Sequence, residues 1–92
     1  MQSYRARVDR NEAEIIKALR AIKCSVVRLA AVGRGVPDLL VSKAGRTLLI
    51  EVKTQKGKLN ELQEKFVSEW KGEVHTCRSP IDAVNAVLNS AS

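Results

Sequence analysis

Three charged residues interrupt the otherwise apolar stretches of segment 36–53, VPDLLVSKAGRTLLIEVK. Residues two apart on a strand share a face, so Glu51 and Lys53 point the same way. Asp38 stands early in the preceding stretch, and a hairpin between the two stretches would bring it close to Glu51. Burying an unpaired carboxylate or ammonium costs several kcal/mol, so these charges need a partner.

A bound metal ion would supply that partner, because two carboxylates a few ångströms apart repel each other without a cation. A hard divalent ion such as Mg²⁺ binds one or two carboxylates, a main-chain carbonyl and water. The predicted ligands are Asp38, Glu51 and the carbonyl of Val52. Lys53 would then orient a nucleophile or stabilise developing negative charge. In the alternative interpretation, Glu51 and Lys53 reach water at a strand's end, and Asp38 only forms a Pro-Asp turn.

A third acid could come from the first predicted helix. Apolar residues at 15, 16, 19 and 22 predict a helix over 9–23, which Asp9 or Asn11 would cap. At about 100° per residue, Glu12 lies about 20° from the inward Leu19, whereas Glu14 lies nearer the solvent edge. Either acid is a candidate ligand. Both could instead only favour the positive end of the helix.

The remaining segments supply the elements that would position these groups. Strands are predicted over 25–31, over 36–42 with Pro37 at its start, over 47–53 and over 73–77, with a hairpin turn at 44–46. A helix is predicted over 60–71, with Leu62, Phe66, Val67 and Trp70 pointing inward. Ser79 and Pro80 are typical of the start of a last helix, about 80–89.

The order helix, three strands, helix, strand, helix predicts an α/β fold with a mixed sheet flanked by helices. The continuous apolar run of 47–53 favours a central strand buried on both faces. The crossover through a helix to 73–77 implies a parallel pair. We expect one domain over residues 1–92.

Composition limits the classes of function. The net charge of +6 favours a polyanionic partner such as nucleic acid, although solubility alone would also account for it. Cys24, Cys77 and the single His75 offer too few soft ligands for zinc, and we expect reduced thiols. No apolar stretch approaches the roughly 20 residues that span a bilayer, and MQSYRARVDR has no signal-peptide centre, so we expect a cytosolic protein without a membrane partner. With 3% aromatic residues the core is small, which favours self-association.

The pattern Glu12, V-P-D at 36–38 and E-V-K at 51–53 resembles the PD-(D/E)xK nuclease superfamily. With Gly35, Leu59, Gln63, Phe66 and Trp70, it is more specifically similar to the virus-type replication-repair nuclease (VRR-Nuc) domain and to Holliday-junction resolvase-like enzymes. The resemblance implies a restriction-endonuclease-like αβββαβα core and a Mg²⁺- or Mn²⁺-dependent endonuclease acting on branched DNA such as Holliday junctions.

The same resemblance implies roles for single residues. Asp38 and Glu51 would be metal ligands, Lys53 the catalytic lysine and Gln63 a glutamine near the site. Relatives place the helix acid at the position of Glu12 or of Glu14, so both stay open, and Asn60-x-x-Gln63 also resembles a capping box.

The resemblance further implies a homodimer, for which Trp70, Val87 and Leu88 are candidate interface residues. Basic segments that carry Arg34, Lys56 and Lys58 would flank each site and hold DNA phosphates. The first alternative is a non-catalytic DNA-binding module of this fold. The second is an interaction subunit whose buried charges pair with one another.

Overall fold

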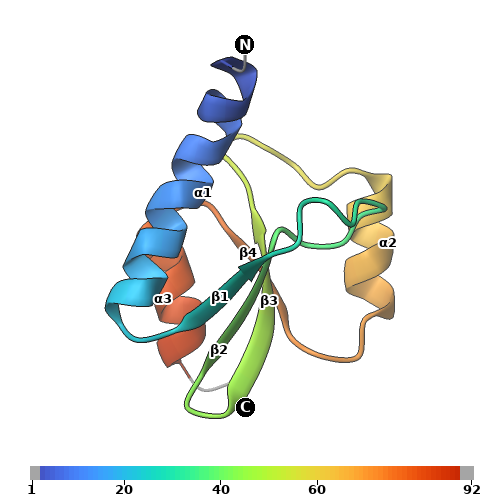
Figure 1. The fold of residues 1–92 in the computed structure, drawn as a ribbon. Helices are drawn as coiled ribbons and strands as arrows, with labels where there is room; N and C mark the ends of the chain where they lie inside the picture. The colour runs from blue at the N-terminus through green and yellow to red at the C-terminus, as the bar shows by residue number, and fades with distance from the viewer. Residues whose placement is uncertain (1–2, 90–92) are drawn as a thin grey trace.

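The computed structural model describes residues 3–89, with side chains from Arg10 onward. The elements are α1 (Ser3–Ala21), β1 (Ser25–Arg28), β2 (Leu39–Lys43), β3 (Arg46–Val52), α2 (Glu61–Glu69), β4 (Val74–Cys77) and α3 (Pro80–Leu88). Figure 1 shows the sheet between α1 and α3 on one side and α2 on the other. The predicted α/β order and the mixed, helix-flanked sheet are confirmed. None of the described helices is long and apolar enough to cross a membrane.

The four strands lie in the order β1-β2-β3-β4. β2 pairs antiparallel with β1 and β3, and β3 pairs parallel with β4, so both the hairpin and the crossover are confirmed. Ala44 and Gly45 join β2 to β3 with φ of 53° and 83°. Two positive φ values are typical of the tight turns whose twist matches a hairpin. β3 is central, as its apolar run predicts.

The core lies on the face of the sheet that α1 and α3 cover. Leu48 and Ile50 of β3 enter this core, and the register places them opposite Val41 and Leu39 of β2. α1 adds Ile15, Ile16 and Leu19, and α3 adds Ala83 and Val87. Because alternate residues of a strand face opposite sides, Leu49 and Glu51 are turned away from this core, as predicted.

Several predicted boundaries are wrong. α1 begins at Ser3, because residues 3–8 contain no glycine or proline to stop a helix. Asp9 and Asn11 therefore lie inside the helix and do not cap it. β1 ends at Arg28, and β2 begins at Leu39, after Pro37. Pro37 is buried ahead of the strand and is not its first residue.

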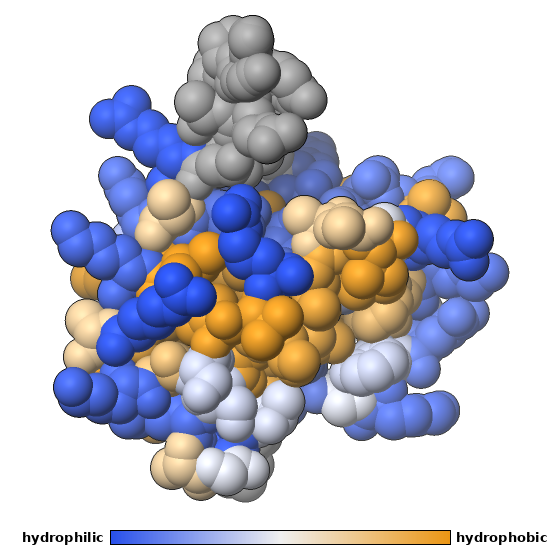
Figure 2. All heavy atoms as spheres, viewed as in Figure 1, coloured by the Kyte–Doolittle hydropathy of each residue, from blue (hydrophilic) through white to orange (hydrophobic). Residues whose placement is uncertain are grey.

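The predicted inward face of α2 is wrong for Leu62, Val67 and Trp70, which are exposed, whereas Phe66 is half-buried. No residue of this helix is buried, and the side chains of Leu62 and Trp70 are 57% and 48% exposed. α2 is the one described helix on its side of the sheet, so no second helix covers its apolar stripe. Phe66 instead stacks on Trp70, with ring centroids 5.1 Å apart. In Figure 2, hydrophobic atoms gather on the viewed face over the sheet and extend toward α2.

Candidate active site

Asp38 lies where the pairing of β2 with β3 ends. Leu39 pairs with Ile50, and continuing this register by two positions places Pro37 opposite Val52. Proline has no main-chain N–H, so the ladder stops there. The Val52 N–H instead donates to Asp38 Oδ2 at 2.8 Å. The sequence V-P-D therefore fixes a carboxylate beside the end of β3 and leaves the Val52 carbonyl without a donor from Pro37.

Glu51 lies next to Asp38, as the hairpin prediction requires, and is only 3% exposed. Burial, followed by the neighbouring Asp38 carboxyl group through its charge and a hydrogen bond, raises the pKa of Glu51 to about 8. The Lys53 ammonium group acts in the opposite direction, with Nζ 3.8 Å from Glu51 Oε2. Near neutral pH Glu51 therefore retains its proton in the absence of a cation.

Gln63 ties the first turn of α2 to Glu51. Its Nε2 donates to Glu51 Oε2 at 3.0 Å. Its Oε1 accepts from the Asn60 N–H at 2.9 Å, and Asn60 Oδ1 accepts from the Gln63 N–H at 2.9 Å. The capping box and the contact with Glu51, which the sequence left as alternatives, are thus made by one side chain at once. Gly35 supports this arrangement, because a Cβ there would collide with the Leu62 carbonyl.

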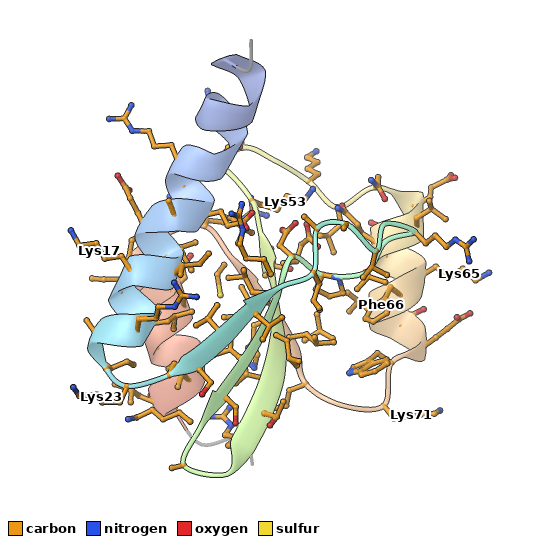
Figure 3. All side chains as sticks on the ribbon, in the orientation of Figure 1. Lys17, Lys23, Lys53, Lys65, Phe66 and Lys71 are labelled. Carbon is orange, nitrogen blue, oxygen red and sulfur yellow. The ribbon has the colours of Figure 1, made fainter. Side chains whose placement is uncertain are left out.

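Lys53 is held through its main chain from two sides. Its N–H donates to the Cys77 carbonyl at 3.0 Å, and its carbonyl accepts from Asn11 Nδ2 at 3.0 Å. Figure 3 shows Lys53 at the end of the sheet that lies between α1 and α2. Sequence reasoning missed this role of Asn11, since a polar residue near a predicted helix start is first read as a cap. Its position directly before the inward Glu12 was the available signal.

The two acids of α1 lie in different surroundings. Glu12 is 5% exposed, and its charge is among the causes that raise the pKa of Glu51. Its Oε2 accepts from Arg28 Nε at 2.7 Å, an ion pair that the sequence did not indicate. Glu14 is exposed and is not among the groups brought to Glu51. The structure therefore brings Glu12, and not Glu14, to the site.

The donor set fits a hard divalent cation. Asp38 and Glu51 supply adjacent carboxylates, and the Val52 carbonyl lies on the strand between Glu51 and Lys53. Within residues 10–89, no three His, Cys, Asp or Glu side chains form a ready metal-binding group. Mg²⁺ does not need one, since it retains several waters and is bound through one or two carboxylates. Among the described residues, the two cysteines are buried free thiols, and burial raises the pKa of Cys77 to about 12, which disfavours the thiolate that a soft metal would need.

The predicted DNA-binding residues Arg34, Lys56 and Lys58 are all exposed. Arg34 has a positive φ of 59° and lies between Gly33 and Gly35 in the loop that leads to Asp38. Lys56 and Lys58 lie in the segment that follows Lys53. Basic side chains therefore stand in the chain on both sides of the site's acidic pair.

The family model of the archaeal Holliday junction resolvase (Hjc) matches residues 3–69. The chain belongs to this family. Searches of curated proteins and of solved structures gave no significant match. The matched range contains Glu12, Asp38, Glu51, Lys53 and Gln63 and ends before β4 and α3. The predicted resemblance to Holliday-junction resolvases is confirmed, and nucleases of this kind generally use divalent metals.

Proposed function

We propose that this Hjc-family chain is a metal-dependent, structure-selective endonuclease that hydrolyses phosphodiester bonds in branched DNA such as Holliday junctions. The observation that carries the proposal is the buried pair Asp38 and Glu51, with Lys53 beside it. A carboxyl group whose pKa is raised to about 8 by burial and a second acid is typical of a site that awaits a cation. The proposed cofactor is Mg²⁺ or Mn²⁺.

Each side chain has a part in this mechanism. Asp38 and Glu51, with the Val52 carbonyl, would hold the metal, which when bound supplies an activated water and charge neutralisation at the phosphate. Lys53 stabilises negative charge that develops on the phosphate oxygens. Gln63 holds the Glu51 carboxylate in one orientation through its amide. Glu12 is the proposed acid of α1, and Arg28 holds its carboxylate toward the site.

The partner we propose is branched DNA bound by a homodimer in the cytoplasm. The net charge of +6 and the exposed Arg34, Lys56 and Lys58 support contacts with phosphates, which position DNA by shape without reading bases. The exposed apolar side chains of α2 support a dimer interface there (Figure 2). Trp70, next to the end of α2, stays a candidate for it. Leu88 is exposed on α3, on the other side of the sheet, and would need a separate interface. Val87 is not a candidate, because it is 7% exposed within the core.

A finer assignment to the VRR-Nuc branch of the superfamily remains part of the proposal and rests on the V-P-D and E-V-K segments with Gln63. The non-catalytic DNA-binding module is the runner-up. It shares the basic surface but predicts no product with any divalent ion. In the interaction-subunit alternative the buried charges would satisfy one another, whereas Lys53 Nζ lies 3.8 Å from Glu51 and Asp38 adds a second acid.

The deciding experiment is a cleavage panel of four-way junction, flap, splayed arm and duplex, with and without Mn²⁺. We expect metal-dependent cleavage of the branched substrates. Lys53→Ala should lower the single-turnover rate by about 10²–10³-fold while junction binding is retained. Lys71→Ala, an exposed lysine at the far end of α2 (Figure 3), is the matched control and should cleave normally. Full cleavage by the Lys53 variant would refute the mechanism.

Calorimetric Mn²⁺ titration separates the alternatives in the same preparation. Asp38→Asn should weaken Mn²⁺ binding at least about tenfold, because it removes a charged ligand. Glu14→Gln, a change of an exposed acid on α1, should leave the titration unchanged. If the wild-type protein takes up no Mn²⁺ and binds little DNA, the interaction subunit is the correct description. An unaltered titration of Asp38→Asn removes this residue from the metal site.

A further inference from the structure

Arg78 lies in the part of the chain beyond the family match and reaches back to the loop that follows Lys53. Its Nη1 group donates to the carbonyls of Thr54 at 2.7 Å and of Gly57 at 2.6 Å, and it lies 3.5 Å from the carbonyl of Gln55. The Thr54 carbonyl also accepts from the Gly57 N–H at 3.2 Å, which closes a turn. One guanidinium group thus gathers the carbonyls of this turn on one side.

The start of α3 sets the direction of Arg78. Ser79 caps this helix, and its Oγ accepts from the Asp82 N–H at 3.1 Å. The Asp82 carboxylate accepts in return from the Arg78 N–H at 2.8 Å. These reciprocal bonds fix the backbone of Arg78 between β4 and α3. The local sequence R-S-P-I-D therefore positions the Arg78 backbone through contacts that do not involve loop 54–58.

Because Arg78 fixes the direction of the loop carbonyls, it also fixes the direction of the N–H groups that follow them in the chain. In a trans peptide the C=O and the following N–H point in opposite directions. The N–H groups of Gln55 and Lys58 therefore point away from Arg78, and no described residue accepts from either. Lys56 and Lys58 are exposed, and neither forms an ion pair with a residue in the described range. Main-chain N–H groups without an acceptor, in a loop that also carries two exposed lysines, can together bind an anion.

We propose that Arg78 is a positioning residue for DNA binding, which holds loop 54–58 so that its lysines and main-chain N–H groups receive a DNA phosphate. This inference rests on the proposed function, since it assumes branched DNA as the ligand. The contacts that hold loop 54–58 are separate from those that hold the catalytic Lys53. Lys53 is fixed by the Cys77 carbonyl and by Asn11, one residue before the first carbonyl that Arg78 holds. Loss of Arg78 therefore weakens binding and leaves the reacting groups in place.

The test measures affinity for a labelled four-way junction, with Ca²⁺ in place of Mg²⁺, for Arg78→Gln, for the double variant Lys56→Gln/Lys58→Gln and for all three changes together. Arg78→Gln and the double lysine variant should remove the same phosphate contacts. We therefore expect each to bind about tenfold more weakly, with a salt dependence that corresponds to about one to two fewer phosphate contacts. The triple variant should bind no worse than about threefold below the double variant. Arg78→Lys, which keeps a charged donor, should recover most of the affinity.

Cleavage rates at saturating junction provide the second readout. Arg78→Gln should retain its single-turnover rate within about threefold, so the defect appears in KM and not in kcat. Asn11→Ala should do the opposite, because it releases the Lys53 carbonyl. Independent, multiplicative losses in the triple variant would show that Arg78 contacts DNA directly or only stabilises the fold, and would overturn the inference. Unchanged affinity of Arg78→Gln would do the same.

The two proposals fail in different ways. A wild-type protein that binds junctions without cutting them refutes the endonuclease and leaves the binding comparison of Arg78 intact. A wild-type protein that cuts junctions, with an Arg78→Gln variant that binds as tightly, refutes only the role of Arg78. A wild-type protein that binds no DNA refutes both. Thermal unfolding of each variant, with Arg78→Lys as the conservative reference, shows whether a loss of affinity comes from a loss of fold.

Discussion

Two glutamates near opposite ends of β3 have opposite surroundings. Glu73, just before β4, receives two hydrogen bonds from Arg46, from Nη2 at 2.6 Å and from Nε at 3.0 Å, and lies 3.0 Å from His75 Nε2. Arg46 first, and His75 second, lower the pKa of Glu73 to about 2. Burial and Asp38 raise the pKa of Glu51 to about 8. Glu73 is matched by the Arg46 guanidinium group, whereas Glu51 is crowded by acids.

The difference separates a structural ion pair from a binding site. Arg46 also donates to the Val87 and Asn89 carbonyls, so Glu73 and Arg46 join the start of β3 to the end of α3. Their charges cancel within the fold, and nothing further is needed. Glu51 receives an amide hydrogen bond and lies 3.8 Å from the Lys53 ammonium group. Asp38 and Glu12 both raise its pKa, and Glu12 is paired with Arg28. Among the described residues, three acids therefore share two cations, and a group perturbed in this way is typical of a functional site.

The largest expected effect comes from replacing each glutamate by glutamine. Glu51→Gln should lower single-turnover cleavage of a four-way junction by at least about 10²-fold, because it removes a charged metal ligand. Glu73→Gln, the matched control, should cleave within about threefold of the wild type, and its free energy of unfolding should fall by about 1 kcal/mol. Equal cleavage defects in the two variants would contradict the assignment of Glu51 to a metal site and of Glu73 to a structural ion pair.

The pH dependence of stability without metal gives the next effect. The pKa of Glu51 is raised from 4.5 to about 8, so its contribution is complete below pH 4.5 and is lost as the pH rises toward 8. The pKa of Glu73 is lowered from 4.5 to about 2, so its contribution is present above pH 4.5 and is lost as the pH falls toward 2. The two glutamates therefore limit stability from opposite sides.

Denaturant unfolding in the presence of a chelator should show that the free energy of unfolding falls by on the order of a few kcal/mol between pH 5 and 8. Glu51→Gln should remove most of the loss, whereas Glu73→Gln should retain it. Mn²⁺ should also reduce it, and its binding at pH 7 should release a proton, detected by calorimetry in two buffers of different ionisation enthalpy. A wild-type protein equally stable at pH 5 and pH 8 without metal would contradict the crowded-acid description of Glu51.

The sequence predicted the parts of this comparison that depend on local pattern. Alternation in E-V-K placed Glu51 and Lys53 on one face, and the predicted hairpin brought Asp38 close to Glu51. The hairpin register then follows from the tight turn at Ala44 and Gly45, which pairs Lys43 with Arg46. The sequence alone was therefore sufficient to predict that Asp38 and Glu51 lie together.

The parts that the sequence did not predict depend on contacts between distant segments. Arg78 reaches Thr54 across 24 residues, and Asn11 reaches Lys53 across 42. The local sequence indicates where each backbone lies, but it does not indicate which distant segment the side chain contacts. The apolar stripe of α2 was misassigned for a related reason. Helical spacing shows which residues share a face, but the partner of that face is a property of the whole fold.

The smallest expected effect comes from Gln63→Glu, which changes the surroundings of Glu51 while the helix start is kept. Glutamate at this position retains the acceptor for the Asn60 N–H and is favoured in the first turn of a helix. The change therefore replaces only the amide that donates to Glu51 with a third acid. At pH 8 without metal, we expect Tm to fall by about 4–8 °C, equivalent to about 1 kcal/mol. At pH 5 the decrease should be smaller, because Glu51, whose pKa is raised to about 8, is then protonated and uncharged.

Thermal unfolding with and without Mn²⁺ tests whether this loss comes from uncompensated charge. Mn²⁺ should raise the Tm of Gln63→Glu by more than that of the wild type, because the cation neutralises one more acid. Gln63→Ala is the control, since it removes both the cap and the amide and should lose about 1 kcal/mol at either pH. If Gln63→Glu unfolds at the wild-type temperature at pH 8 without metal, further negative charge beside Glu51 does not destabilise the fold. The description of Glu51 as crowded by acids would then be wrong.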